Sequence, residues 1–216
     1  MRYPSAYAGV KKIFGGTVLK LIGSLFLAAA LFTGLLALAR LDAAAEPISE
    51  EALILGIGTT AAIIPGTILP IIAFFLAMVG LSEASRDEEA NFQIAFWISI
   101  AGVVITVVDA AFKGTGVDTF GFVDMLSDVA ALVATIFMIN GVTVLAKELG
   151  RDDVIRFGRV VKAIAIAILA TAVALTVLKG NAAVSMTSAK VSIVLGVVST
   201  SSFLAFLARA KAMLAE

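Results

Sequence analysis

Long stretches without a charged residue alternate with short charged segments along this chain. Six long stretches occur, at residues 21–39, 52–82, 90–108, 129–146, 163–178 and 191–208. Five of them contain 16 to 19 residues, and a helix of that length is roughly 24–29 Å long because each residue adds about 1.5 Å. The hydrocarbon core of a bilayer is about 30 Å thick. We therefore predict an all-α, polytopic integral membrane protein with six transmembrane helices in three helical hairpins.

The predicted helices form a single transmembrane domain that comprises the whole chain, residues 1–216. Ahead of the first helix, residues 1–14 combine two tyrosines, a phenylalanine and two lysines. Aromatic and basic side chains favour the level of the lipid headgroups, so we expect an interfacial N-terminal segment there. The expected helix bounds are about 17–40, 58–82, 91–112, 122–147, 158–179 and 187–209.

The end of the first predicted helix is similar to a signal-peptide cleavage site, with the sequence LDAAAE at residues 41–46. The apolar stretch before it has 19 residues, whereas the apolar region of a signal peptide usually has about 7–15. We therefore expect this helix to be retained in the protein.

Basic residues are divided unevenly between the two sides of the predicted helices. Twelve lysines and arginines fall on the side of both termini and four on the other side. Because basic residues accumulate in cytoplasmic loops, we predict that both termini are cytoplasmic. We expect a multi-pass protein of the cell (plasma) membrane, with the lipid bilayer as its first partner.

A weak internal repeat joins two of the predicted cytoplasmic turns. The sequences GLSEASRDEEANF (80–92) and VLAKELGRDDVIRF (144–157) share a Glu, an Arg-Asp-acid run and a Phe at an offset of 65 residues. The repeat either reflects three related hairpins or arises because short turns favour the same residue types. Both interpretations remain open.

Composition supports a membrane protein and excludes several kinds of chemistry. Hydrophobic residues make up 61% of the chain and charged residues 15%, and the mean hydropathy is +1.08. The formal net charge is zero, so bulk charge gives no reason to expect a nucleic-acid partner. The chain contains neither Cys nor His, which excludes thiol nucleophiles, Ser–His pairs and metal sites built on these residues. We expect no enzymatic activity and no cofactor.

The second uncharged stretch is too long for one simple crossing, since a helix through its 31 residues would be about 45 Å long. Pro65 and Pro70 each remove a backbone donor, Gly66 adds backbone freedom, and Thr67 offers a hydroxyl. One interpretation is a discontinuous helix that lines a substrate or ion path, as in many transporters. A second interpretation is a helix that is kinked or strongly tilted but continuous. A third is an apolar outer segment, residues 52–60, that lies on the membrane before a normal crossing.

Acidic residues gather around the predicted connection between the third and fourth helices: Asp109, Asp118, Asp124 and Asp128. Asp124 and Asp128 are spaced i, i+4 and share a helix face, which makes them candidate cation ligands at the mouth of a path. Alternatively, acids at this place cap a helix and complement its dipole. Because 18 uncharged residues follow Asp128, we place these acids near the outer boundary and expect no charge at the midplane.

Asn140 lies deeper in the fourth predicted helix, roughly 18 Å inward from Asp128. Its amide needs a partner there, because an unpaired polar group in hydrocarbon is costly. We expect that partner in the sixth helix, as a hydrogen bond between helices or as part of a polar path, from one of four residues: Ser199, Thr200, Ser201 and Ser202.

The sequence favours a small channel or transporter for an ion or small solute, assembled as a homo-oligomer. The alternative is a non-catalytic membrane scaffold or accessory subunit, which packs against itself or a membrane-protein partner through faces rich in Ala and Gly. Under the first hypothesis, the substrate or ion path is lined by Asp109, Asp124, Asp128, Asn140, Pro65, Gly66, Thr67 and Pro70.

Overall fold

The computed structural model describes residues 2–43, 50–114, 122–177 and 182–216 of the chain. Every element in these ranges is an α-helix, as we predicted from the sequence. The six helices are α1 (Pro4–Ala43), α2 (Glu50–Ala84), α3 (Glu89–Gly114), α4 (Phe122–Glu148), α5 (Asp152–Val177) and α6 (Ala182–Ala215).

Five of these helices are long and apolar enough to cross a membrane. The apolar spans within the described residues are Pro4–Ala37, Ile54–Ala84, Glu89–Phe112, Leu126–Glu148 and Leu195–Ala215. α5 is not among them, and its first half carries Arg156, Arg159 and Lys162. A crossing by α5 therefore remains a prediction.

Many large apolar side chains project outward from the helices. Phe32 in α1 is 65% exposed and Trp97 in α3 is 61% exposed, and leucine, isoleucine and valine side chains on the other helices behave in the same way. A water-soluble protein rarely exposes apolar surface on this scale. The protein is therefore membrane-embedded, with these side chains directed at lipid.

The chain divides into two compact units, and the prediction of a single transmembrane domain stays a prediction. The first unit comprises Met1–Phe14 and Met78–Glu216, and the second comprises Gly15–Ala77.

The second unit is a pair of antiparallel helices, formed by α1 after residue 14 and α2 before residue 78. A Cβ atom on Gly66 would lie 2.8 Å from Leu27 Cγ, and one on Gly23 would lie 2.7 Å from Pro70 Cδ. The helices approach this closely because glycine has no side chain at either place. α2 continues through both of its prolines, so the discontinuous-helix interpretation is wrong and the continuous one is confirmed.

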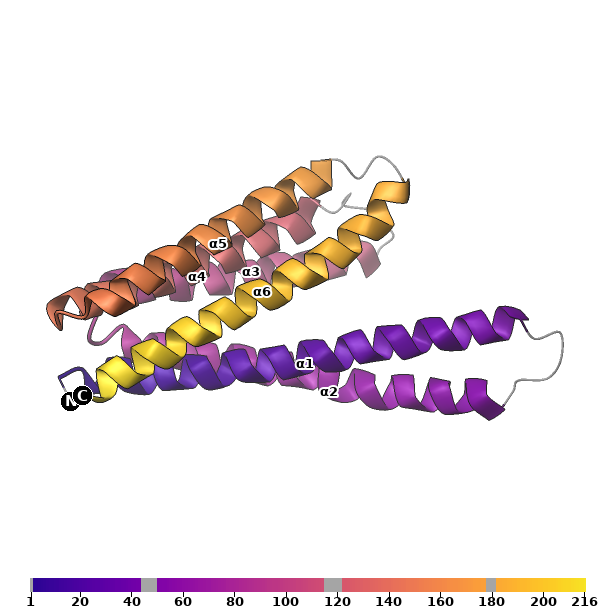
Figure 1. The fold of residues 1–216 in the computed structure, drawn as a ribbon, viewed down its shortest axis with the longest axis horizontal. Helices are drawn as coiled ribbons and strands as arrows, with labels where there is room; N and C mark the ends of the chain where they lie inside the picture. The colour runs from indigo at the N-terminus through magenta and orange to yellow at the C-terminus, as the bar shows by residue number, and fades with distance from the viewer. Residues whose placement is uncertain (1, 44–49, 115–121, 178–181) are drawn as a thin grey trace. The chain divides into compact units, whose positions relative to one another are not determined.

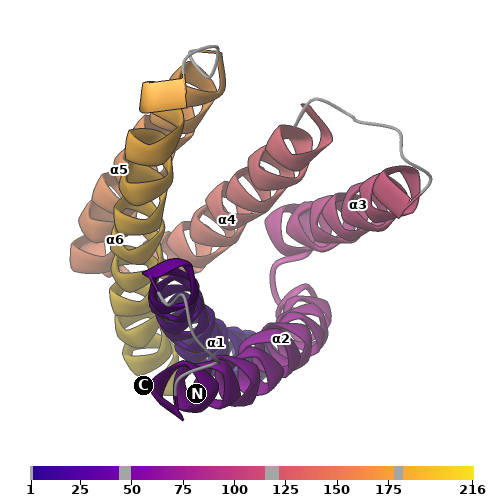
Figure 2. The same ribbon diagram turned by 90° about the vertical axis from the view of Figure 1, so that its right-hand side faces the viewer.

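In the first unit, α3 lies beside α4, α4 beside α5 and α5 beside α6 (Figures 1 and 2). Its core collects at one end, where the first turns of α1 and the last turns of α2 join these helices. Ala6, Val10 and Ile13 of α1 are fully or almost fully buried there. The segment that we expected at the interface, residues 1–14, is helical from Pro4 onward, and its place relative to the membrane stays a prediction.

The two turns that resemble each other in sequence end their preceding helices differently. After α4, Gly150 has φ 67°, and hydrogen bonds from Arg151 N to Ala146 O and from Gly150 N to Lys147 O complete a Schellman motif. After α2, a serine stands at the position equivalent to Gly150, and Asp87 N and Glu88 N both donate to Ala84 O. The repeat in sequence therefore does not extend to the backbone of the turns.

Candidate functional site

A polar seam joins α3 to α4 in the part of these helices that lies away from the chain termini. Gly102 leaves room for Ala130, since a Cβ at Gly102 would lie 3.3 Å from Ala130 Cβ. Thr106 Oγ1 lies 2.8 Å from Ser127 Oγ and also donates to Gly102 O over 3.0 Å. These contacts fix the antiparallel register of the two helices.

Asp109 continues this seam one turn beyond Thr106. Its side chain is 4% exposed, and it is the one buried polar or charged residue found in the described part of the chain. In the register set by Thr106 and Ser127, Asp109 lies at the level of Asp124. α3 ends five residues later at Gly114, so Asp109 lies near the helix end, as we expected. Its burial was not evident from the sequence.

The other three acids of the predicted cluster are placed differently. Asp118 and the side chain of Asp124 lie outside what the structure describes. Asp128 is exposed, and its neighbour Ser127 makes the contact to α3. Asp124 and Asp128 fall in the first two turns of α4, where negative charge complements the helix dipole. Over the described residues, no group of three or more His, Cys, Asp or Glu side chains is arranged to hold a metal ion.

Asn140 bonds to α5, and not to the serines and threonine of α6 that we expected. Lys162 Nζ donates to Asn140 Oδ1 over 2.9 Å, and both groups are partly buried. Thr200 instead donates to Gly196 O within its own helix. The prediction about the partner was wrong because we placed Lys162 at the membrane boundary. The Asp152–Asp153 pair that starts α5 was the signal that Lys162 lies nearly three turns inside the helix.

The four path candidates of α2 lie in the second unit. Thr67 Oγ1 donates to the carbonyl oxygens of Ile63 and Ile64, each over 3.0 Å, so its proton is used within α2. Gly66 is buried and Pro70 packs against Gly23. Pro65 lies inside the continuous helix. These residues position α2 against α1 in the second unit, whereas the polar seam of α3 and α4 belongs to the first unit.

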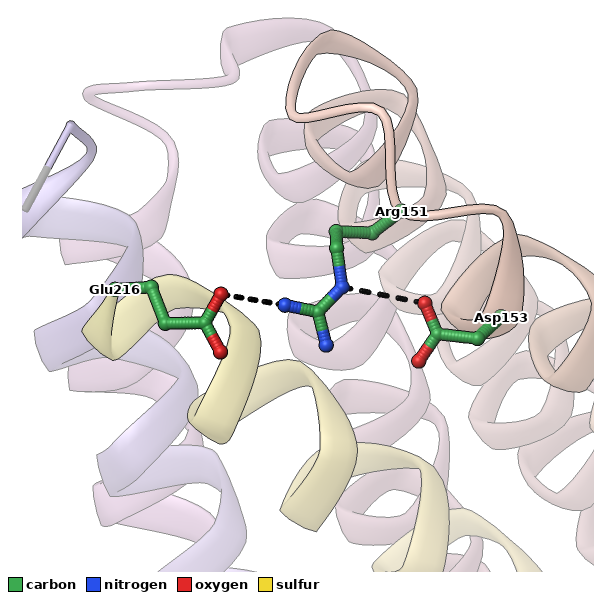
Figure 3. A network of polar contacts seen from close by, with 3 residues as sticks. All are labelled: Arg151, Asp153 and Glu216. Carbon is green, nitrogen blue, oxygen red and sulfur yellow. Dashed lines mark hydrogen bonds and ion pairs between the residues drawn. The ribbon is translucent and has the colours of Figure 1, made fainter.

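A network of charges gathers where the two chain ends meet the turns of the first unit. Arg151 joins two acids: its Nη1 lies 2.5 Å from Glu216 Oε2 and its Nε lies 3.2 Å from Asp153 Oδ1 (Figure 3). Tyr3 donates to Glu148, and Lys12 pairs with Glu83. Both chain ends are therefore held at the same end of this unit, as the prediction of termini on one side requires.

These contacts shift the ionisation of exposed groups at this end. The hydrogen bond from Arg151 lowers the pKa of Asp153, and the hydrogen bonds to Asp153 and Glu216 raise the pKa of Arg151. The hydrogen bond to Glu148 raises the pKa of Tyr3.

A small cavity opens beside this network. Its volume is about 70 Å³, whereas sites for small-molecule ligands usually measure about 300–1,000 Å³. It is therefore too small to bind an organic substrate. Its lining consists of Arg2, Tyr3, Leu149, Arg151, Met213, Leu214 and Glu216.

No protein-family model, curated protein or solved structure matches the chain. Two features inside the helices of the first unit have chemistry beyond packing: the buried carboxyl of Asp109 and the Lys162–Asn140 pair. The contacts of α4 with these two features are on different faces of the helix, since Ser127 contacts α3 and Asn140 contacts α5. The first can bind a cation or a proton, and the second presents hydrogen-bond donors.

Proposed function

We propose that the protein is a small membrane channel or transporter that moves an ion or small solute and works as an oligomer. The observation that carries this proposal is the burial of Asp109, which lies in an apolar span of α3 and is 4% exposed. An ionisable side chain within a membrane helix is costly, and such residues commonly mark ion paths and proton relays.

The chemistry of the seam favours a cation as the first class of permeant to test. Asp109 supplies a carboxylate, and the hydroxyls of Thr106 and Ser127 lie one turn away along the same seam. Oxygen ligands of this kind suit hard cations. The proposal places the seam on the outer side of the plasma membrane, because the excess of Lys and Arg lies on the side of the termini.

Flux into liposomes tests the proposal. We expect purified protein to pass at least one of a panel of monovalent and divalent cations. Asp109→Asn should reduce this flux by about tenfold or more, because it removes the buried charge, whereas Asp128→Asn should reduce it less because Asp128 is exposed.

Glu89→Gln is the matched control for this experiment. It also removes one acid from α3, but at the exposed first turn of the helix, and it should leave flux unchanged. Flux that is the same in wild type and Asp109→Asn would exclude Asp109 from the path.

A scaffold or accessory subunit is the second candidate, and the close helix packing of the first unit favours it. A Cβ on Gly9 would lie 2.3 Å from Gly80 O, and one on Gly80 would lie 2.6 Å from Gly9 O. Contacts this close need small residues and make rigid assemblies. A scaffold predicts no flux with any cation, together with co-purification of a fixed membrane-protein partner.

A further inference from the structure

Lys162 is a partly buried cationic side chain of α5, and its hydrogen-bond partner is a neutral amide. It follows Asp152, the first residue of α5, by ten positions, which is about 15 Å along the helix. Among the described residues, no carboxylate forms an ion pair with its ammonium group. A partly buried cation without a counter-charge is stabilised when an anion joins it.

The pair that Lys162 forms with Asn140 presents hydrogen-bond donors and almost no acceptors. Lysine can only donate, so the atom that it contacts on Asn140 must be the amide oxygen. The amide NH₂ group then points away from the ammonium group, and in the described part of the chain no hydrogen bond uses it. Two N–H groups of Lys162 and two of Asn140 remain for a ligand, and a site made of donors selects an anion.

The Lys162 side chain crosses to the neighbouring helix instead of extending along its own. Gly158 of α5 contacts Thr143 of α4, since a Cβ at Gly158 would lie 2.8 Å from Thr143 Cγ2. Asn140 lies one turn from Thr143, and Lys162 one turn from Gly158, so the two lie at about the same level. A lysine that only avoids hydrocarbon extends along the helix to the headgroups. The sideways geometry favours a positioned group.

Two arginines lead from the α4–α5 turn to this pair. Arg156 and Arg159 precede Lys162 at intervals of three residues, and both are exposed. Residues three apart on a helix are neighbours on its surface. The guanidinium fork binds phosphate through paired hydrogen bonds, and basic groups between membrane helices on the cytoplasmic side bind phosphorylated lipid headgroups.

We propose that Lys162 and Asn140, with Arg159 beside them, bind a phosphate group between α4 and α5. The phosphate belongs either to the headgroup of an anionic lipid or to a free phosphate ion. This inference is independent of transport, because binding is measured without flux. The Lys162–Asn140 pair also lies between α4 and α5, whereas Asp109 lies in α3.

Two probes separate the sources of the phosphate. The first is inorganic phosphate, titrated against the protein in nanodiscs of phosphatidylcholine, with chloride at equal ionic strength as the reference. The second is phosphatidylglycerol, counted by native mass spectrometry after the protein is released from mixed nanodiscs. We expect wild type to bind one of the two probes.

Three variants test the residues. Lys162→Gln keeps a polar side chain but removes the charge, and it should weaken binding about tenfold, as expected for the loss of one charge-assisted hydrogen bond. Asn140→Asp gives Lys162 a permanent counter-charge, so it should abolish binding while the helices remain folded by circular dichroism. Lys147→Gln removes an exposed basic residue at the end of α4, and it should change binding less than twofold.

The outcomes decide the proposal. Loss of bound phosphatidylglycerol in Lys162→Gln and Asn140→Asp assigns the site to a lipid headgroup, and loss of inorganic phosphate assigns it to a soluble ion. The proposal is wrong if wild type binds neither probe, or if Asn140→Asp binds as wild type does. It is also wrong if Lys147→Gln weakens binding as much as Lys162→Gln, because ordinary surface attraction then explains the effect.

Discussion

At the scale of single residues, the sequence predicted where polar groups lie along the helices, but not which groups surround them. The position of Asp109 near the end of α3 followed from counting uncharged residues, and the structure confirms it. Its burial depends on which face of α3 meets α4, and the spacing of charges does not contain that information. The partner of Asn140 depends on the register between α4 and α5, so Lys162 became apparent only in three dimensions.

The exposed contact between Arg151 and Asp153 gives a prediction about pH. The hydrogen bond from Arg151 lowers the pKa of Asp153 in the folded protein. The contact therefore stabilises the fold above the ordinary aspartate pKa of about 3.9, and this contribution is lost as pH falls through the lowered folded value. Wild type should melt at a slightly higher temperature than Asp153→Asn near neutral pH, and the difference should vanish in strong acid.

Thermal melts in detergent across a series of pH values measure this difference. Asp152→Asn is the matched control, because it removes the adjacent exposed acid of the same helix turn, which lacks the bond to Arg151. A difference between wild type and Asp153→Asn that persists unchanged into strong acid would contradict the assigned cause.

At the scale of helices, charge spacing predicted α3 and α4 to within about two residues but placed the start of α1 too late. The expected helix at 17–40 is Pro4–Ala43 in the structure. Lys20 marked the start of the uncharged stretch in our count, yet a helix continues through charged residues when its other face is buried. The spacing of charged residues therefore predicts which part of a helix lies in the hydrocarbon core more directly than it predicts where the helix begins and ends.

The pairing of α1 with α2 in the second unit predicts opposite effects for two glycine substitutions. Gly66→Ala should destabilise the protein by about 1–3 kcal/mol, because its Cβ would meet Leu27 Cγ at 2.8 Å and Leu27 N at 3.1 Å. Gly58→Ala meets nothing within 4 Å and should be neutral or stabilise by up to about 1 kcal/mol through helix propensity.

Unfolding of both variants in the same detergent provides the measurement. If Gly66→Ala were as stable as Gly58→Ala, then α1 and α2 would not be packed as closely as the structure shows.

At the scale of the whole molecule, the central claim is that stretches without charged residues cross the bilayer and the charged turns lie at its two surfaces. In the part of the chain that the structure describes, there are six helices, and five of them are long and apolar enough to cross, which supports this claim. The hydrogen bond and the ion pair that hold both chain ends at one end of the first unit agree with it. α5 provides the critical test of the claim, because three basic residues lie in its first half.

Labelling of single cysteines in intact and permeabilised cells tests this claim most directly, since the natural chain has no cysteine to remove. Ser85→Cys lies between α2 and α3, and Asn181→Cys lies between α5 and α6. The account predicts that a membrane-impermeant maleimide labels Asn181→Cys in intact cells but Ser85→Cys only after permeabilisation. Labelling of both positions from the same side, or of Asn181→Cys only after permeabilisation, would contradict it.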